Sequence, residues 1–346
     1  MTQPQISADA RAAALRAFLA GTLPGIAFDV APASSDASFR RYFRITLHDA
    51  CALAPGAATL IAMDAPPPRE DCRPFVHVAA LLAAAGVNAP AVLAQDLDQG
   101  FLLLTDLGTR MYQDALDEAS AHGLYVDALG ALVQWQLSTR AGVLPPYDEA
   151  TLAYEVALFP DWYVARHLQR HLTADEQATL AATFRLVLAN SLAQPQVFVH
   201  RDYHSRNLMV CTRNPGVLDF QDALVGPITY DLVSLLRDAY VEWSEERQLD
   251  WVIRYWERAR AAGLPVAGDF AVFWRDFEWM GVQRQLKVLG IFARLYHRDG
   301  KDVYLQHMPR VMRYLRGAAG RYGELAPLAG LLDALDERQA AVGYTF

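Results

Sequence analysis

The chain has 346 residues, of which 53% are hydrophobic and 20% charged, so it is long enough for one large core or for two lobes. Its formal net charge is −8 and no long basic run occurs, which argues against general binding to nucleic acid or to an acidic membrane surface. The three cysteines are too few and too scattered for a disulfide framework or a zinc site, and the N-terminus does not resemble a secretory signal. We therefore expect a cytoplasmic protein with no membrane, nucleic-acid or obligate protein partner.

The first third of the chain is predicted to be a small α+β lobe. After a short amphipathic helix, short segments rich in β-formers alternate with Pro, Gly, Ser and Asp, which is typical of an antiparallel meander. A helix closed by Gly86 and two further strands around the turn 98–100 complete the pattern. The expected helices are 7–19 and 74–85, and the expected strands are 26–31, 38–47, 59–63, 91–95 and 101–105.

The rest of the chain is predicted to be mostly helical, because apolar residues recur at three- and four-residue spacing. The expected helical runs are 119–139, 149–171, 174–193, 244–262, 268–297 and 301–317. We place the boundary at residue 106, with a lobe built on a small mixed sheet over 1–106 and a larger helical lobe over 107–346. The block 197–222 lacks this helical spacing and is predicted to form short apolar strands separated by polar loops.

The polar loops of this block carry the residues that phosphoryl transfer needs. That reaction requires a carboxylate beside the attacking hydroxyl and oxygen ligands that hold Mg²⁺ against the phosphates. Asp202 follows a strand, Asn207 opens the next strand, and Asp219 ends the third. A β-hairpin would bring Asn207 and Asp219 to the same end, with Asp202 beside them. The spacing therefore predicts a catalytic base and a magnesium site.

The string from His200 to Asn207, followed by L-D-F-Q-D ending at Asp222, resembles the aminoglycoside phosphotransferase and choline kinase family. This resemblance implies a protein-kinase-like bilobal fold, ATP and Mg²⁺ as cofactors, Asp202 as the catalytic base, and Asn207 and Asp219 as metal ligands. His200 belongs to the same catalytic string. The second histidine, His204, and the second acid, Asp222, favour this family over protein kinases and are expected near the acceptor. Asp231 would brace the catalytic loop, or simply carry charge at a helix start.

The first lobe fits this family in outline and departs from it in detail. Ser34, Ser35 and Ser38 occupy the place of a phosphate-covering loop, although no glycine is present. Met63 stands where the family's phosphate-binding lysine is expected, which leaves Arg40 and Arg44 as candidate replacements. Glu70 or Asp71 would ordinarily pair with that lysine, and here they are expected to cap the following helix. Thr105, Asp106 and Leu107 fit the segment whose backbone meets adenine.

Further segments, among them D-A-S-F-R-R-Y-F-R-I, M-D-A-P-P and R-Q-L-K-V-L-G-I-F-A-R-L, resemble the bacterial N-acetylmuramate/N-acetylglucosamine anomeric kinases of cell-wall recycling. Methionine in M-D-A-P is shared with that group, and the resemblance runs from about residue 36 to residue 310. It implies phosphorylation of an amino sugar at its anomeric hydroxyl. Trp162 and Tyr163 could stack on a sugar ring, and Arg284 and Lys287 could meet a carboxylate on it.

Four questions stay open at the level of sequence. The acceptor could be another small alcohol or an aminoglycoside, and the chain could be a pseudokinase that binds nucleotide without turnover. The sequence does not distinguish ATP from GTP or give the oligomeric state.

Overall fold

The computed structural model describes residues 8–35 and 39–342. It divides into two units, the first formed by Met1–Arg110 with Met209–Asp222, and the second by Met111–Leu208 with Ala223–Phe346. The chain thus leaves the first unit a few residues after position 106 and returns to it for a short segment. The single predicted boundary at residue 106 does not account for Met209–Asp222, which also belong to the first unit.

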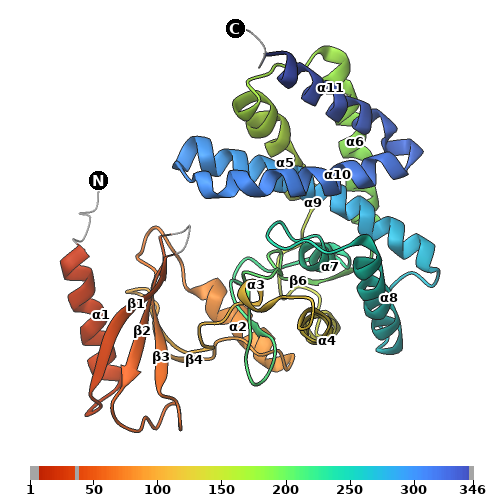
Figure 1. Cartoon of the computed structure of the whole chain (residues 1–346). Helices are drawn as coiled ribbons and strands as arrows, with labels where there is room; N and C mark the ends of the chain where they lie inside the picture. The colour runs from red at the N-terminus through yellow and green to blue at the C-terminus, as the bar shows by residue number, and fades with distance from the viewer. Residues whose placement is uncertain (1–7, 36–38, 343–346) are drawn as a thin grey trace. The chain divides into compact units, whose positions relative to one another are not determined.

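The first unit is a five-stranded sheet with one helix on each face (Figure 1). Every strand pair in it is antiparallel, so the expectation of a mixed sheet was wrong and that of an antiparallel meander was right for its first three strands. The strand order is β1-β2-β3-β5-β4. The strands are β1 (Phe28–Ser35), β2 (Arg41–Leu47), β3 (Thr59–Asp64), β4 (Val92–Asp96) and β5 (Phe101–Thr105), and the helices are α1 (Ala8–Thr22) and α2 (Arg73–Ala84).

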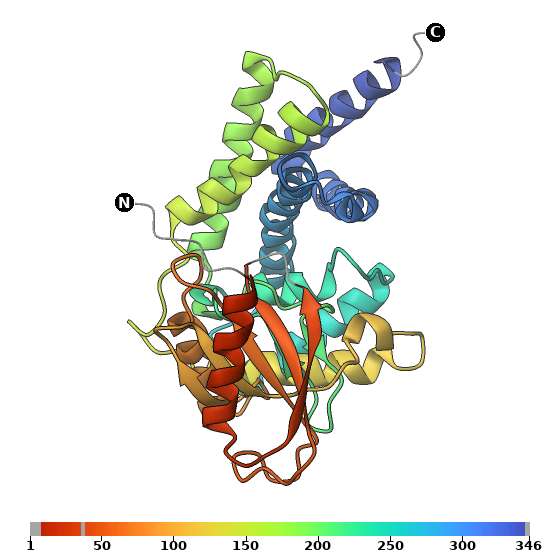
Figure 2. The same cartoon turned by 90° about the vertical axis from the view of Figure 1, so that its left-hand side faces the viewer.

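Alternation along the strands builds the core of this unit. Leu15 and Leu19 of α1 pack on Ile45, Leu60 and Leu103, which lie on one face of the sheet and are almost fully buried. Figure 2 shows α1 lying along that face. Burying each such side chain stabilises the fold by about 1.5–3 kcal/mol.

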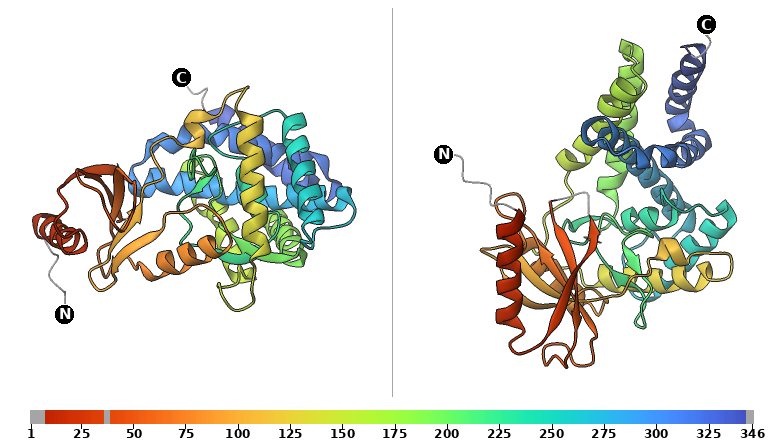
Figure 3. Two further views of the ribbon diagram at one scale, coloured as in Figure 1. Left: turned by 90° about the horizontal axis from the view of Figure 1, so that it is seen from below. Right: turned by 60° about the vertical axis from the view of Figure 1, so that its left-hand side comes forward.

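The second unit is built on one long helix, α9, against which α5, the π-helix η1, α6, α7 and α10 pack (Figure 3). In the left panel α4 and α8 lie side by side. The elements are α3 (Tyr112–Ala115), α4 (Ala121–Leu137), α5 (Glu149–Leu158), η1 (Phe159–His167), α6 (Ala174–Ala193), α7 (Tyr230–Leu236), α8 (Glu245–Ala261), α9 (Phe270–Asp299), the 3₁₀ helix η2 (Asp302–His307), α10 (Met308–Arg321), the 3₁₀ helix η3 (Gly323–Leu325) and α11 (Ala326–Val342). No helix in residues 8–35 and 39–342 has the length and apolarity needed to cross a bilayer.

The helices differ from the predictions at η1 and at α11. The run predicted over 149–171 is α5 followed by the π-helix η1, and the change of helix type coincides with Pro160. Proline has no N–H for the ordinary helical hydrogen bond and crowds the preceding turn, so the backbone widens there. α11, beyond the last expected run, had not been predicted.

The strand-rich block forms two separate pairs. β6 (Gln196–Val199) pairs antiparallel with β9 (Leu224–Pro227), and β7 (Leu208–Met209) pairs with β8 (Gly216–Val217). The loop between β6 and β7 contains Asp202, and Asp219 follows β8 by two residues. These two loops carry the predicted chemistry.

Candidate active site

The loop after β6 has a strained backbone that is held by a buried carboxylate. Arg201 has φ of 77°, a conformation that costs a non-glycine residue energy. Asp231, in the first turn of α7, accepts the backbone N–H of His200 at 2.6 Å and of Arg201 at 2.9 Å. Burial raises the pKa of Asp231 to about 6, and these two N–H groups and His200 oppose that rise. Asp231 therefore braces the catalytic loop, besides carrying charge at the helix start.

Two further side chains fix the main chain of Asp202. His200 is buried, and its Nδ1 accepts the backbone N–H of Asp202 at 3.2 Å, which places the ring proton on Nε2 when the ring is neutral. Asn207 donates its Nδ2 to the carbonyl oxygen of Asp202 at 2.9 Å. With the amide nitrogen turned toward the chain, the amide oxygen is the atom of Asn207 that suits a cation.

The Asp202 carboxylate lies in a strongly positive environment. Its burial by itself would raise its pKa, but the charges of Lys287, His204, Arg284 and His200 outweigh that effect and bring the pKa below its usual range. Burial lowers the pKa of His204, so its ring is mostly neutral at neutral pH. Lys287 and Arg284 then carry most of the positive charge that acts on Asp202. Asp202 is therefore ionised at neutral pH, as a proton acceptor must be.

A buried ion network lies next to Asp202 in the second unit. Glu155 of α5 binds Arg201 at 2.6 Å and Lys287 at 3.0 Å, and Lys287 Nζ donates to the hydroxyl of Tyr230 at 2.9 Å. Burial raises the pKa of Glu155 and the two cations more than reverse that, so the carboxyl is ionised. Lys287 was predicted to meet the acceptor; the structure places it at 7% exposure, bound to Glu155 and Tyr230.

His204 belongs to the same loop and Arg284 lies near it, and both have fewer partners. Arg284 is 5% exposed and has no ion-pair or hydrogen-bond partner in residues 8–35 and 39–342. The His204 ring packs edge-on against Tyr240 with centroids 5.4 Å apart, and its buried Nδ1 has no hydrogen-bond partner in the same part of the chain. Asp238, which acts on His204, accepts the backbone N–H of Ser205 at 2.9 Å.

Asp219, in the first unit, also has an unusual backbone. Its φ is 60°, and the side-chain amide of Gln221 donates to its Oδ1 at 2.8 Å. A strained backbone held by a neighbouring side chain is common at sites where a carboxylate must point in one direction. Asp222, three residues later, is exposed.

Arg40 and Glu70 form an ion pair in the first unit. Arg40 Nε lies 3.1 Å from Glu70 Oε2, and the backbone N–H of Phe39 donates to the other oxygen at 3.1 Å. Burial works against the charge of Arg40, but Tyr42, Glu70 and Asp219 outweigh it and raise its pKa. Of the two residues expected to cap α2, Glu70 does not, because its carboxylate is bound by Arg40, whereas Asp71 accepts the backbone N–H of Arg73, the first residue of α2, at 3.0 Å.

Arg44 and the segment after β5 form a second ion pair. Arg44 Nε binds Asp106 at 2.6 Å, and its Nη2 donates to the carbonyl of Gly108 at 2.9 Å. Thr105 Oγ1 accepts the N–H of Ala91 at 2.9 Å, and the carbonyl of Leu107 accepts the thiol of Cys211 at 3.2 Å. The polar side chains of Thr105 and Asp106 are bound to protein groups. A contact with adenine in this segment would therefore be made by backbone atoms.

The remaining nucleotide candidates belong to β1 and β3. Ser34 and Ser35 are the last residues of β1, paired with Tyr42 and Arg41, where a loop had been expected, and Ser38 lies outside the described residues. Met63 is buried on β3 at 1% exposure.

The two aromatic acceptor candidates differ in exposure. Tyr163 is buried in η1 between the rings of Phe159 and His167, at centroid distances of 5.2 and 5.7 Å. Trp162 is half-buried. Of the two, only Trp162 keeps ring surface that a sugar could cover.

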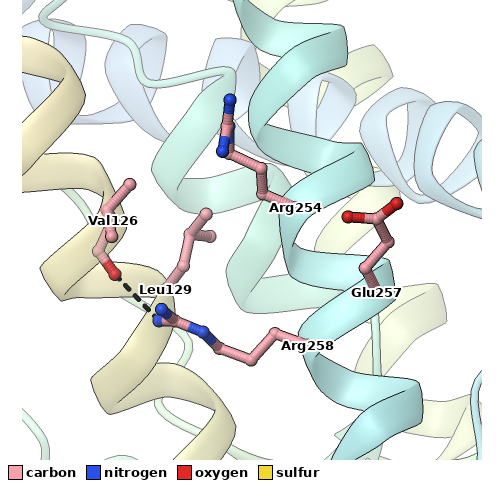
Figure 4. A pocket seen from close by; sticks show the side chains of 5 residues that line it. All are labelled: Val126, Leu129, Arg254, Glu257 and Arg258. Carbon is pink, nitrogen blue, oxygen red and sulfur yellow. Dashed lines mark hydrogen bonds between the residues drawn. The ribbon is translucent and has the colours of Figure 1, made fainter.

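A separate pocket of about 220 Å³ lies between α4 and α8 (Figure 4). Val126 and Leu129 line it from α4, and Arg254, Glu257 and Arg258 from α8. Arg258 donates to the carbonyl of Val126 at 3.0 Å and Arg254 pairs with Asp250 at 2.7 Å, so both cations already have protein partners. The catalytic-loop residues do not line it, and we assign it no role.

Sequence reasoning missed Glu155 and Gln221. Glu155 stands in the largely apolar string A-Y-E-V-A-L, and this setting is the sequence signal that could have indicated a buried acid. Gln221 stands two residues from Asp219, within the motif itself.

Comparison with known proteins places the chain in a family. The model of the phosphotransferase enzyme family matches residues 29–268. The chain belongs to this family and is a kinase. It is 53% identical over 309 residues to the N-acetylmuramate/N-acetylglucosamine kinase of Pseudomonas aeruginosa, covering 89% of each chain. It is 49% identical over 337 residues to the kinase of that name from Neisseria meningitidis, covering 96% of this chain and 98% of the relative.

Solved structures share the fold. A choline kinase from Cryptosporidium parvum matches with a TM-score of 0.62 at 11% identity, covering 93% of this chain and 99% of the other. An aminoglycoside phosphotransferase in complex with gentamicin matches with a TM-score of 0.57 at 14% identity, covering 90% of this chain and 97% of the other. The expected α+β, protein-kinase-like fold is thereby confirmed.

Proposed function

We propose that this kinase transfers the γ-phosphoryl group of ATP to the anomeric hydroxyl of N-acetylmuramate or N-acetylglucosamine, in the cytoplasm, as a step of cell-wall recycling. The observation that carries the proposal is identity of about one half, over 89–96% of the chain, to relatives named as kinases of these two sugars. The loop around Asp202 supports it, since Asp231 holds the backbone of this loop and Asn207 binds the carbonyl oxygen of Asp202.

In the proposed reaction Asp202 orients the acceptor hydroxyl and takes its proton. The hydroxyl oxygen forms a bond to the γ-phosphorus, the bond from that phosphorus to the β,γ-bridging oxygen breaks, and ADP leaves with the electron pair. An anomeric hydroxyl is more acidic than an ordinary alcohol, so it suits a carboxylate whose pKa is lowered by neighbouring cations. Most of the acceleration would come from positioning and charge neutralisation.

The residues fit Mg²⁺ as the metal of this reaction. Asn207 and Asp219 offer amide and carboxylate oxygens, the hard ligands that Mg²⁺ prefers, and local hydrogen bonds orient both side chains. When bound, the metal would neutralise charge on the β- and γ-phosphates. We assign Arg40, held by Glu70, as the cation that replaces the missing lysine. The backbone of 105–107 would meet the adenine, and the end of β1 at Ser34 and Ser35 would approach the phosphates.

An aminoglycoside is the second candidate acceptor, and one observation weighs against it. Arg284 and Lys287 are buried cations whose charges reach Asp202. A polycationic acceptor would be repelled there, whereas a neutral or acidic sugar would not.

An acceptor panel tests the proposal. The purified chain is incubated with MgATP and, separately, N-acetylmuramate, N-acetylglucosamine, the methyl glycoside of N-acetylglucosamine, gentamicin and choline, and ADP release and phosphorylated product are measured. We expect turnover of both free sugars and none of the glycoside, whose anomeric oxygen is blocked. Turnover of the glycoside would place the reaction at another hydroxyl. Turnover of gentamicin or choline alone would refute the sugar assignment, and no turnover at all would indicate a pseudokinase.

A further inference from the structure

Arg284 is a buried cation that no carboxylate of the described residues binds directly, although its charge acts on Asp202. The other lysine and arginine residues buried to this degree in the described part of the chain, Arg11, Arg237 and Lys287, each bind a carboxylate. Arg284 is 5% exposed and, within residues 8–35 and 39–342, has no hydrogen bond or ion pair. A charge taken out of water without a partner destabilises the protein, so its retention calls for a ligand.

The surroundings of Arg284 place it beside the reacting hydroxyl. It lies on α9, three residues before Lys287 and so on the same side of the helix. Lys287 binds Glu155, and Glu155 binds Arg201, the residue before Asp202. Further along α9, Phe292 contacts Tyr240, which in turn packs on His204, with centroids 6.3 and 5.4 Å apart. This side of α9 therefore runs along the catalytic loop, and the charge of Arg284 acts on both Asp202 and His204.

We propose that Arg284 binds a carboxylate carried by the acceptor sugar and thereby sets the preference of the enzyme for an acidic over a neutral acceptor. The inference rests on the proposed function. A planar guanidinium matches a carboxylate with two parallel hydrogen bonds, which a lysine cannot do. Lys287 is engaged by Glu155 and Tyr230, so of the two cations Arg284 is the one whose donors are not bound to a carboxylate of the described residues. N-acetylmuramate carries such a carboxylate and N-acetylglucosamine does not, so one contact separates the two sugars.

The experiment compares an acid with its own neutral ester. kcat/KM is measured for N-acetylmuramate, its methyl ester and N-acetylglucosamine with the unaltered enzyme, Arg284→Gln, Arg284→Met and Arg275→Gln. Arg275 is an exposed arginine of the same helix and serves as the matched control. We expect the unaltered enzyme and Arg275→Gln to prefer the acid over the ester by about 10- to 100-fold, the usual range for a charged hydrogen-bonded pair. In both Arg284 variants the preference should fall to near unity, with a much smaller change for N-acetylglucosamine.

Thermal unfolding of the ligand-free proteins separates binding from a structural role. Arg284→Met removes an unpaired buried charge, so its melting temperature should equal or exceed that of the unaltered enzyme. A lower melting temperature, or an acid-to-ester preference that survives in either Arg284 variant, would overturn the proposal. An equal fall in kcat/KM for all three acceptors in the Arg284 variants, together with a raised KM for MgATP, would also overturn it. The guanidinium would then bind the phosphates of the nucleotide. If the unaltered enzyme phosphorylates neither sugar, it is the proposed function that fails.

Discussion

At the scale of single residues, the site depends on the pKa of Asp202. A carboxylate can accept the acceptor's proton only when ionised, and the cations around it hold its pKa below the usual range. Lys287 makes the largest favourable contribution, although its ammonium group is bound to Glu155 rather than to Asp202. In the proposed mechanism Lys287 is thus a positioning residue that acts through Asp202.

Replacing Lys287 should change the pH profile of the enzyme. In Lys287→Met the positive charge is gone, so the pKa of Asp202 rises and the acidic limb of the kcat/KM profile moves to higher pH. Measurement of kcat/KM between pH 4 and 8 tests this.

Two controls separate this effect from loss of the buried pair. Glu155→Gln breaks the same pair but keeps the lysine charge, so its acidic limb should not move upward. Lysine occurs elsewhere in the chain only at position 301, and Lys301→Met should leave the profile in place. An upward shift in Glu155→Gln equal to that in Lys287→Met would show that the account of the base is wrong.

Arg40 and Arg44 should respond differently to removal of their charge. Arg40 is within electrostatic reach of Asp219, whereas Arg44 is bound to Asp106 and Gly108. Arg40→Met should raise the KM for MgATP by about 10- to 100-fold, and Arg44→Met by much less. Steady-state kinetics at saturating acceptor would decide between them, and a larger effect at Arg44 would reverse the assignment.

At the scale of elements, α9 crosses the junction of α5 and η1 at Gly290. A Cβ added at Gly290 would lie 2.4 Å from the backbone carbon of Leu158, closer than any relaxed contact. The absence of a side chain therefore lets two helix backbones meet, and the same helix carries Arg284 and Lys287 to the catalytic loop.

Gly290→Ala should lower stability by about 1–3 kcal/mol, the usual cost of overpacking, and lower the melting temperature accordingly. Gly317 of α10 is the matched control, because a Cβ there meets nothing within 4 Å. Gly317→Ala should stabilise the protein by about 0.5–1 kcal/mol, since alanine favours a helix over glycine. A melting temperature for Gly290→Ala at or above that of the unaltered protein would contradict the close crossing.

The sequence predicted most elements because hydrophobic periodicity is a local property. α9, α6 and α8 were predicted within a few residues, and β5 at its exact bounds, since each carries a clear apolar pattern. The π-helix was missed because its geometry follows from Pro160 and packing against α9. The spacing of His200, Asp202, Asn207 and Asp219 is visible in the sequence itself, and the family resemblance supplied their expected roles. The partners of Lys287 and Arg40 are not visible there, because Glu155 and Glu70 are distant in sequence and meet them only in the fold.

At the scale of the whole molecule, the fold and the acceptor are set by different residues. Choline kinase and aminoglycoside phosphotransferase structures share this fold at 11–17% identity, so the fold alone does not select the acceptor. Under the proposed function, Arg284 on α9, whose charge acts on Asp202, is where this chain would select a neutral or acidic sugar over a polycation.

The turnover of Asp202→Asn at saturating MgATP and sugar tests the central claim most directly, with nucleotide affinity measured on the same sample. Asparagine keeps the shape of the side chain and cannot accept the proton. We predict a fall in kcat of about 10²- to 10⁴-fold with nucleotide affinity retained. A kcat within about tenfold of the unaltered enzyme, well short of the loss expected for a general base, would show that this loop does not perform the phosphoryl transfer.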